Sequence, residues 1–231
     1  MIVSIHQPHY FPWLRYINKI ASSKVFVIYD DVKYQKNGWI NRTMIRNQTP
    51  LRLVIPVHSN GMTMISEVQI VNDIWKVKHI KTIQYAYAKS PYFKEHFDPV
   101  RDIIMNSQKY LAEINIDTIL WIVKVLGLKT KVILSSELKV GSSGTKRLVE
   151  ICQKVGADTY LTGKYALNTY LDPNEFKSAG IRLVYSDFEC KTYPQMKHKD
   201  FISDLSIIDL LMNLDVEQCV KYISNSKLIE V

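Results

Sequence analysis

Residues 131–163 read KVILSSELKVGSSGTKRLVEICQKVGADTYLTG, and this stretch decides the expected fold. Its two ends, 131–134 and 159–162, are short apolar runs of the kind that form buried strands. Between them, 145–155 carries apolar residues at helical spacing, after a Gly-Ser-Ser-Gly turn that offers a helix N-cap. A further apolar run at 182–185 repeats the pattern of right-handed βαβ crossovers. The stretch therefore predicts an α/β protein with a mostly parallel sheet.

The same two patterns extend toward the N-terminus. Strands are also expected at 2–5, 24–29, 51–57 and 67–71, and helices at 13–21, 73–88 and 99–126. The last helix is expected to break near 107–110. Asp98 followed by Pro99 predicts where that helix starts, because a capping residue before a proline is typical of a first turn.

The chain is expected to form one domain over residues 1–231, since it shows no internal repeat and no low-complexity linker. Asn60-Gly61 is a turn signal, so residues 50–72 are expected to form a β-hairpin inserted into the α/β layers. Residues 200–231 are expected to be a helical C-terminal part, with two amphipathic helices between 200 and 223.

Composition argues against several classes of protein. Hydrophobic residues make up 47% of the 231, enough for a sizeable core. No eighteen consecutive residues are apolar, and the first residues, MIVSIHQP, lack the pattern of a signal peptide. Cys152, Cys190 and Cys219 stand far apart without a C-x-x-C motif, so we expect reduced thiols. These features predict a cytoplasmic protein without membrane insertion.

The formal net charge of +8 favours anionic partners such as phosphates, nucleotide-linked metabolites, nucleic acid or an anionic membrane face. Because no run of five Lys or Arg occurs, we expect no nucleic-acid partner. A phosphorylated small molecule fits the dispersed charge.

The segment IHQPHYFPWLRY, residues 5–16, holds His6 and His9 between the first strand and the first helix. Ligands of open α/β sheets bind past the carboxyl ends of strands, and a helix start suits a phosphate. The alternative is a pair of turn histidines with satisfied hydrogen bonds. No metal site is predicted, because the other histidines show no ligand motif: His58, His79, His96 and His198.

Residues 29–46 supply further polar groups after the second strand. Asp30 and Asp31 suit a hydroxyl, an amine or a magnesium ion, while Arg42 and Arg46 suit a phosphate or carboxylate. The alternative is a solvated, charged loop. Nearby aromatic and amide side chains are candidates to seat a sugar or base, with core packing as the alternative for the tryptophan: Tyr10, Tyr34, Trp39 and Asn41.

Two later segments add candidate phosphate contacts. Lys78, Lys81 and Tyr85 share one face of the helix expected at 73–88, which is either solvated surface or a diphosphate-binding face. The loop and helix start at 141–147 could cradle a phosphate or serve as an ordinary N-cap. The end of the strand expected at 159–162 and the residues after it would form a second wall of the same binding crevice at the sheet edge. The candidate residues of the loop and of this second wall are Ser142, Ser143, Thr145, Arg147, Thr162, Gly163, Tyr170 and Asp172.

Three common motifs are missing from the sequence. It has no G-x-x-x-x-G-K-[ST] P-loop, no G-x-G-x-x-G dinucleotide loop and no G-x-S-x-G nucleophile elbow. Nicotinamide chemistry and covalent hydrolysis are therefore disfavoured.

Six segments in order resemble the WbqC-like protein family over almost the whole chain: HQPHYFPWLRY, DDVKYQKNGWINR, KHIKTIQYAYAKSPYF, GTKRLVEICQKVGADTYLTGKYALNTYLD, TYPQ and DLSIIDLL. Members of this family are associated with bacterial surface polysaccharide (O-antigen) gene clusters, near enzymes that make nucleotide-linked amino sugars. Many members have Gly where this chain has Arg15.

A more distant resemblance connects the H-x-x-H spacing with the H-x-G-H signature of nucleotidyltransferase-like Rossmann ligases such as pantothenate synthetase. Pro8 replaces the glycine of that signature, which restricts a close approach of the backbone to phosphate. The second signature of that superfamily has only a poor counterpart here, around Lys197, Lys199 and Ser203.

Together these resemblances imply an α/β enzyme with a nucleotidyltransferase-like Rossmann core. It would join an amino acid such as glycine, or another small acyl unit, to the amine of a nucleotide-linked amino sugar through an ATP-made acyl adenylate. His6 and His9 would stabilise phosphate charge, helped by Lys78, Lys81 and Arg147, while Asp30 or Asp31 would orient or deprotonate the amine.

Several points stay open at this stage. The resemblances leave undecided whether ATP and Mg²⁺ are used, and no tightly bound cofactor is expected. The oligomeric state is also open, with a homodimer as one option. The alternatives are a glycosyltransferase or other nucleotide-sugar enzyme without ATP, a non-catalytic binding protein of the polysaccharide machinery, and metal-dependent hydrolysis.

Overall fold

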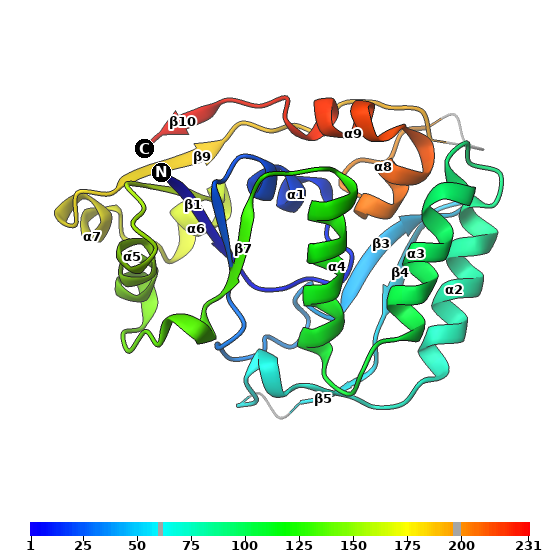
Figure 1. Ribbon diagram of the computed structural model, residues 1–231, viewed down its shortest axis with the longest axis horizontal. Coiled ribbons are helices and arrows are strands. Elements are labelled where there is room, and N and C mark those ends of the chain that lie inside the picture. Colours follow the sequence, from blue (N-terminus) through cyan, green and yellow to red (C-terminus); the bar gives the residue numbers. More distant parts are fainter. Residues whose placement is uncertain (60–61, 196–199) are drawn as a thin grey trace.

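A computed structural model describes residues 1–59, 62–195 and 200–231 and is built around a six-stranded sheet (Figure 1). The strand order is β10-β9-β8-β1-β2-β7. All neighbouring strands are parallel except β10, which pairs antiparallel to β9. The strands are β1 (Ile2–His6), β2 (Val25–Ile28), β7 (Lys131–Leu134), β8 (Thr159–Thr162), β9 (Arg182–Ser186) and β10 (Leu228–Glu230).

The order of these strands confirms the expected Rossmann-like α/β fold with a mostly parallel sheet. From β1 the chain adds β2 and then β7 on one side, and it returns to add β8 and β9 on the other. The order therefore reverses between β1 and β8, and ligands of such sheets bind outside the carboxyl ends of the strands at such a point. His6, the last residue of β1, lies opposite Ile28 of β2 at this edge.

Helices cover both faces of the sheet because successive strand residues point to opposite sides. Phe26 and Ile28 pack with one group of helices, while Val25 and Val27 pack with the other. The first group is α1 (Leu14–Ala21), α4 (Leu111–Val125), α8 (Ile207–Asn213) and α9 (Val216–Ile223). The second is α5 (Gly144–Lys154), α6 (Lys164–Thr169) and α7 (Pro173–Ser178).

The long connection from β2 to β7 contains a second hydrophobic core, formed by residues such as Ile45, Trp75 and Ile83. This insertion pairs β3 (Arg42–Arg46) with β4 (Pro50–Val54), and β5 (Val57–His58) with β6 (Gln69–Ile70). Its helices are α2 (Ile74–Tyr87) and α3 (Phe93–Met105), and a short 3-10 turn spans Ile65–Glu67. A second such turn, Ser136–Leu138, follows β7.

The structure corrects the predicted hairpin at 50–72. The chain from 50 to 54 pairs back to 42–46, a segment predicted as loop, and only 57–58 pairs with 69–70. The charges of Arg42 and Arg46 concealed a strand whose Thr43 and Ile45 both point into the core. The expected Asn60-Gly61 turn lies outside the described residues.

The predicted helix start at Pro99 is also wrong, because α3 begins at Phe93 and contains Pro99 in its interior. The break before α4 and the two C-terminal helices are confirmed. Short α6, α7 and β10 were not predicted, since three to six residues carry too little periodicity. None of the helices in the described ranges has the length and apolar character needed to cross a membrane.

Candidate functional site

The histidine pair lies at the carboxyl end of β1, where the sequence predicts it. His6 ends the strand, and the turn that follows places the ring of His9 4.8 Å from that of His6, centroid to centroid and nearly perpendicular. His6 Nδ1 lies 3.1 Å from the carbonyl of Gln7. That hydrogen bond requires the proton on Nδ1, so it leaves Nε2 of His6 as an acceptor.

Three aromatic side chains surround the pair and complete what we call the histidine cluster: Trp13, Tyr16 and Trp39, with His6 and His9. The rings of Trp13 and Tyr16 lie 4.9 and 5.2 Å from that of His9. Trp39 comes from the insertion and packs against Trp13 at 5.6 Å. The H-x-x-H motif is therefore set in an aromatic wall built from two distant segments.

Burial keeps both imidazoles neutral. It lowers the pKa of His9 to about 3, with a further contribution from the charge of Lys19. Burial also lowers the pKa of His6 well below its usual value, helped by Lys19 and His9. At neutral pH neither ring carries the positive charge that the sequence interpretation assigned for binding phosphate, so any contribution must come from neutral hydrogen bonds.

The buried Nδ1 atom of His9 has no hydrogen-bond partner among the described residues. Leaving a buried polar atom unpaired costs about 1–3 kcal/mol. His9 itself does not line the pocket described next; Trp13, whose ring lies 4.9 Å from that of His9, does.

A pocket of about 210 Å³ opens beside the cluster, and Trp13 and Trp39 form part of its wall. Thr43 and Met44 of β3 line it, and Arg15 and Asp204 form an ion pair with 3.0 Å between nitrogen and oxygen. This volume is below the roughly 300–1,000 Å³ typical of sites for drug-sized ligands. It suits one ring of a substrate rather than a whole nucleotide sugar.

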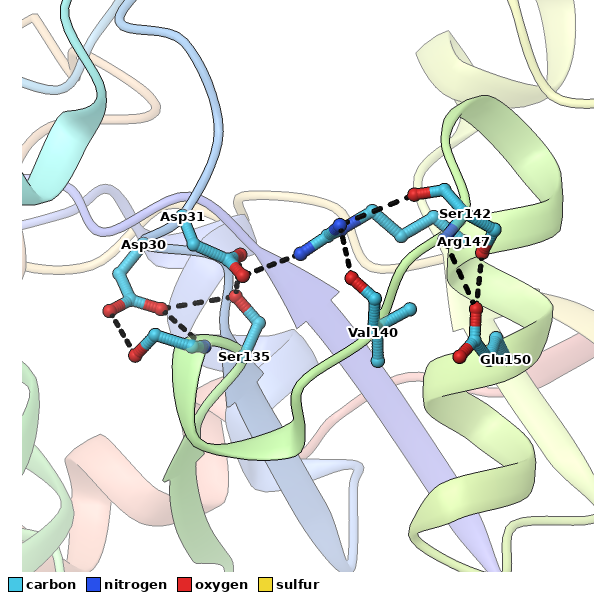
Figure 2. A network of polar contacts seen from close by, with 8 residues as sticks. Asp30, Asp31, Ser135, Val140, Ser142, Arg147 and Glu150 are labelled. Carbon is cyan, nitrogen blue, oxygen red and sulfur yellow. Dashed lines mark hydrogen bonds and ion pairs between the residues drawn. The ribbon is translucent and has the colours of Figure 1, made fainter.

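A second group of polar residues lies at the ends of β2 and β7 (Figure 2). We call Asp30, Asp31, Ser135 and Ser136, with Arg147, the acidic cluster. Asp30 accepts hydrogen bonds from the Ser135 hydroxyl at 3.0 Å and from the Ser136 N–H and hydroxyl at 3.0 and 2.7 Å. Asp30 is buried, so its carboxylate mainly joins the two strand ends. The sequence pointed to Asp30 but not to the serines, which follow a strand more than a hundred residues later.

Asp31 also accepts from the Ser135 hydroxyl at 2.5 Å, and its other oxygen pairs with Arg147 of α5 at 2.5 Å (Figure 2). The same guanidinium donates to the carbonyls of Val140 and Ser142 at 2.9 and 3.2 Å. It also lies over the Tyr29 ring, 5.6 Å from the centroid. Arg147 thus reaches the carboxyl edge of the sheet as predicted, but its charge is already balanced by Asp31.

The other residues predicted around 141–172 act mostly as local structural groups. The Ser142 hydroxyl donates to Glu150 at 2.5 Å, and Ser143 precedes α5 without a side-chain cap. The Thr145 hydroxyl accepts from the N–H of Asp172 at 3.1 Å and lies 3.5 Å from the Tyr170 carbonyl, and Asp172 caps α7. The structure therefore brings these predicted residues close together, but their side chains hydrogen-bond to one another and to the local backbone.

At the switch point itself, Thr162 is buried at the end of β8 and Gly163 leads into α6. Tyr29 links the two clusters: its N–H donates to the His6 carbonyl at 2.8 Å, and its ring contacts Arg147. The histidine and acidic clusters are thus neighbours along one edge of the sheet.

Seven predicted residues do not join this edge. Lys78, Lys81 and Tyr85 are exposed on α2, on the side opposite the buried His79. Tyr10 and Tyr34 are buried in the core of the insertion, and the Asn41 amide donates to the Ile55 carbonyl at 2.9 Å. Arg42 begins β3 and donates to the Asn41 side chain. Tyr10 and Tyr34 therefore serve core packing, whereas Trp39, for which the sequence left core packing open, is 39% exposed and lines the pocket.

A buried set of polar residues, which we call the interior network, was not predicted as a unit. Asp209 of α8 accepts hydrogen bonds from the hydroxyls of Tyr87 and Tyr193 at 2.9 and 2.6 Å and from Gln195 at 3.0 Å. Arg46 of β3 donates to Gln195 at 2.7 Å. The only sequence signal was that these residues fall in or beside segments that resemble the WbqC-like family.

Among the residues that the structure describes, no three His, Cys, Asp or Glu side chains gather in a way that could hold a metal ion. Lys197 and Lys199, considered as a second phosphate signature, lie outside the described residues, and Ser203 lies in the segment before α8.

Comparison with known proteins supports one family over nearly the whole chain. The sequence model of the WbqC-like protein family matches residues 7–221. An uncharacterized protein of Mycobacterium tuberculosis, Rv1507c, is 30% identical over 220 residues, which cover 93% of this chain and 94% of that protein. No solved structure matches the chain.

Proposed function

The chain belongs to the WbqC-like protein family, and from that premise we propose that it is an enzyme of bacterial surface polysaccharide (O-antigen) synthesis. It would join a small acyl unit, such as an amino acid, to the amine of a nucleotide-linked amino sugar. The observation that carries the proposal is the neutral pair His6 and His9, set beside a tryptophan-lined pocket at the carboxyl end of the strand from which the sheet is wound in both directions.

The pocket supports binding of a sugar ring. Trp13 and Trp39 offer aromatic surface, and the Arg15–Asp204 pair adds polar groups at the wall. Since the pocket has room for about one ring, the nucleotide part would extend along the carboxyl edge of the sheet. Backbone N–H groups and hydroxyls at that edge would supply contacts to its phosphates.

The histidines have distinct roles in this proposal. His6 has an acceptor nitrogen, Nε2, that can accept a hydrogen bond from the attacking amine and orient it; because burial lowers the pKa of His6 well below its usual value, the ring does not keep the proton. With a pKa near 3, His9 is a poor base but stays neutral, so it can donate a hydrogen bond to the oxygen that becomes negative as the amide forms. Forming the C–N bond expels the activating group from the acyl carbon, and the amine proton leaves with the expelled group.

This assignment changes the role proposed for the aspartates. Asp30 accepts three hydrogen bonds from Ser135 and Ser136, and Asp31 is paired with Arg147. Because these carboxylates already have partners, we leave the aspartates to position the strand ends and Arg147, and we assign the contact with the amine to His6.

The experiment is to incubate the protein with ATP, Mg²⁺, a panel of amino acids including glycine, and a dTDP-linked amino sugar. We expect AMP and an amide product by mass spectrometry. His6→Ala and His9→Ala should each lower the rate by about 100-fold or more. His58→Ala, which removes an exposed histidine of β5, should leave it unchanged. If neither AMP nor an amide product forms with any of the amino acids, the result counts against the proposal.

A second candidate is a nucleotide-sugar enzyme that does not use ATP, such as a glycosyltransferase. The placement of the cations favours it: Arg147 is paired with Asp31, and Lys78 and Lys81 lie on the outer face of α2. The cations invoked for ATP therefore do not converge on the histidines. Isothermal titration distinguishes the two, because binding of the nucleotide sugar without binding of ATP favours this candidate.

The non-catalytic alternative makes a separate prediction. In a cell that depends on this protein for its surface polysaccharide, a His6→Ala/His9→Ala variant that folds normally should abolish the polysaccharide phenotype if the protein is an enzyme. If the phenotype persists with that variant, a scaffold role is favoured instead.

A further inference from the structure

The outer face of α2 combines apolar and basic side chains in a way that the proposed reaction does not use. Ile74, Val77 and Tyr85 are 64, 50 and 69% exposed, and Lys78 and Lys81 are exposed between them. At 100° per residue these five residues fall on one side of the helix. An exposed apolar stripe along a helix generally marks an interaction surface.

The opposite side of the same helix is fully used by the fold. Trp75, His79, Ile83 and Tyr87 are buried against the core of the insertion. The outer stripe therefore cannot turn inward to be covered without removing these residues from the core. In Figure 1, α2 forms an outer edge of the molecule, at the opposite end from α5 and α7.

The positive charge of this face indicates what kind of surface it binds. From Ile74 to Lys89 the sequence contains no Asp or Glu, and it contains Lys78, Lys81 and Lys89, all exposed. In a two-fold contact between copies of this chain the face would meet its own lysines, and such like-charge contacts are unfavourable. A negatively charged, partly apolar surface matches both kinds of side chain.

We propose that the outer face of α2 is a docking surface for the anionic lipid bilayer. The helix would lie in the plane of the headgroups, with Ile74, Val77 and Tyr85 inserted between lipids and the lysines at the phosphates. Docking is peripheral and reversible, because one helix face buries little apolar area. This inference does not depend on the reaction proposed above.

The test is co-sedimentation of the full chain with vesicles of equimolar phosphatidylglycerol and phosphatidylcholine, compared with phosphatidylcholine alone. We expect binding only to the anionic vesicles, and weaker binding at high salt. Lys78→Glu/Lys81→Glu should lower the partition coefficient by about 10-fold or more. Val77→Asp should also lower it, since it removes an inserted apolar group.

A charge-matched control separates docking from the general attraction of a basic protein. Lys124→Glu/Lys129→Glu changes the net charge equally, at exposed lysines near the end of α4. It should retain most of the binding. Equal loss in both double variants, or no binding by the unmodified protein, would overturn the proposal. So would a dimer, seen by sedimentation velocity, that Val77→Asp dissociates.

Discussion

The carboxyl edge of the sheet and the interior network both hold charged groups away from water, but they are built differently. At the edge, Asp30, Asp31 and Arg147 follow directly from strand ends and a helix start, and they lie beside the neutral His6 and a pocket (Figure 2). The interior network joins β3, α2, α8 and the 193–195 segment, with Asp209 fully buried at its centre. Strand ends gather groups that remain available for chemistry, whereas the interior network fastens the insertion to the C-terminal helices.

This difference predicts that changes at the interior affect stability first. Asp209→Ala leaves the hydroxyls of Tyr87 and Tyr193 and the Gln195 amide without their acceptor. We expect the free energy of unfolding to fall by about 3–5 kcal/mol, measured by urea denaturation. At temperatures where the variant is folded, its rate in the amide-forming assay should be close to that of the unmodified protein. A loss below about 1 kcal/mol would contradict the central position of Asp209.

The buried His9 at the sheet edge should make the stability of the protein depend on pH. The pKa of His9 is about 3 in the folded protein, against an ordinary value of 6.5. Above pH 6.5 the ring is neutral in both states, so pH has no effect through it. As the pH falls from 6.5 toward 3, the unfolded chain binds a proton that the folded chain does not, and stability is lost.

The size of this effect can be measured with His9→Gln. Between pH 6.5 and pH 4 the His9 contribution amounts to about 3 kcal/mol, at about 1.4 kcal/mol per pH unit. As the pH is lowered, the free energy of unfolding should therefore fall less steeply for the variant than for the unmodified protein. Burial also lowers the pKa of His6, His79 and His96, so some acid sensitivity should remain. Identical slopes in both proteins would argue against a neutral, buried His9.

The Asp31–Arg147 pair should have a smaller effect on stability. Arg147→Ala removes the ion pair and the bonds to the carbonyls of Val140 and Ser142, in a region that remains partly open to solvent. We expect a loss of about 1–2 kcal/mol by thermal or urea unfolding. Arg147→Lys serves as the control: it keeps the charge but cannot form the same planar contacts, so it should recover only part of the loss. If Arg147→Ala lowered the free energy of unfolding as much as Asp209→Ala does, the sheet edge and the interior network would not differ in their contribution to stability.

The smallest effect on stability is expected at the wall of the pocket. The Arg15 and Asp204 side chains are about half and one third exposed, so Arg15→Ala should cost less than about 1 kcal/mol. Because Arg15 lines the pocket, the same change should alter the dissociation constant for a nucleotide sugar measured by calorimetry. Unchanged binding would indicate that the sugar ring lies elsewhere along the edge.

Much of the sheet was predictable because its strands are short and uniformly apolar. Residues 25–28 and 159–162 are buried on both faces, as parallel strands between helices must be. The strand at 42–46 was missed because its charged ends suggested a loop, although Thr43 and Ile45 show the alternation of a half-buried strand. For α6, six residues give fewer than two turns of periodicity.

The candidate site was predictable only where its residues are local in sequence. His6 and His9 are separated by two residues, and their position after a strand predicts their place at the sheet edge. Trp39 reaches their neighbour Trp13 from the insertion, and Ser135 reaches Asp30 from another strand end. No local pattern encodes these pairs, because the contacts depend on how the strands are ordered.

The sequence by itself determined most of the strands and helices and which residues stand at strand ends, because apolar periodicity and turn residues act over short distances. Only the tertiary structure decided the charge and availability of those residues. Burial lowers the pKa of His9 and leaves its Nδ1 unpaired, Asp31 balances the charge of Arg147, and the fold of the insertion turns Lys78 and Lys81 to the outer face of α2. Desolvation and charge pairing depend on every group within a few ångströms, and those groups come from segments far apart in the chain.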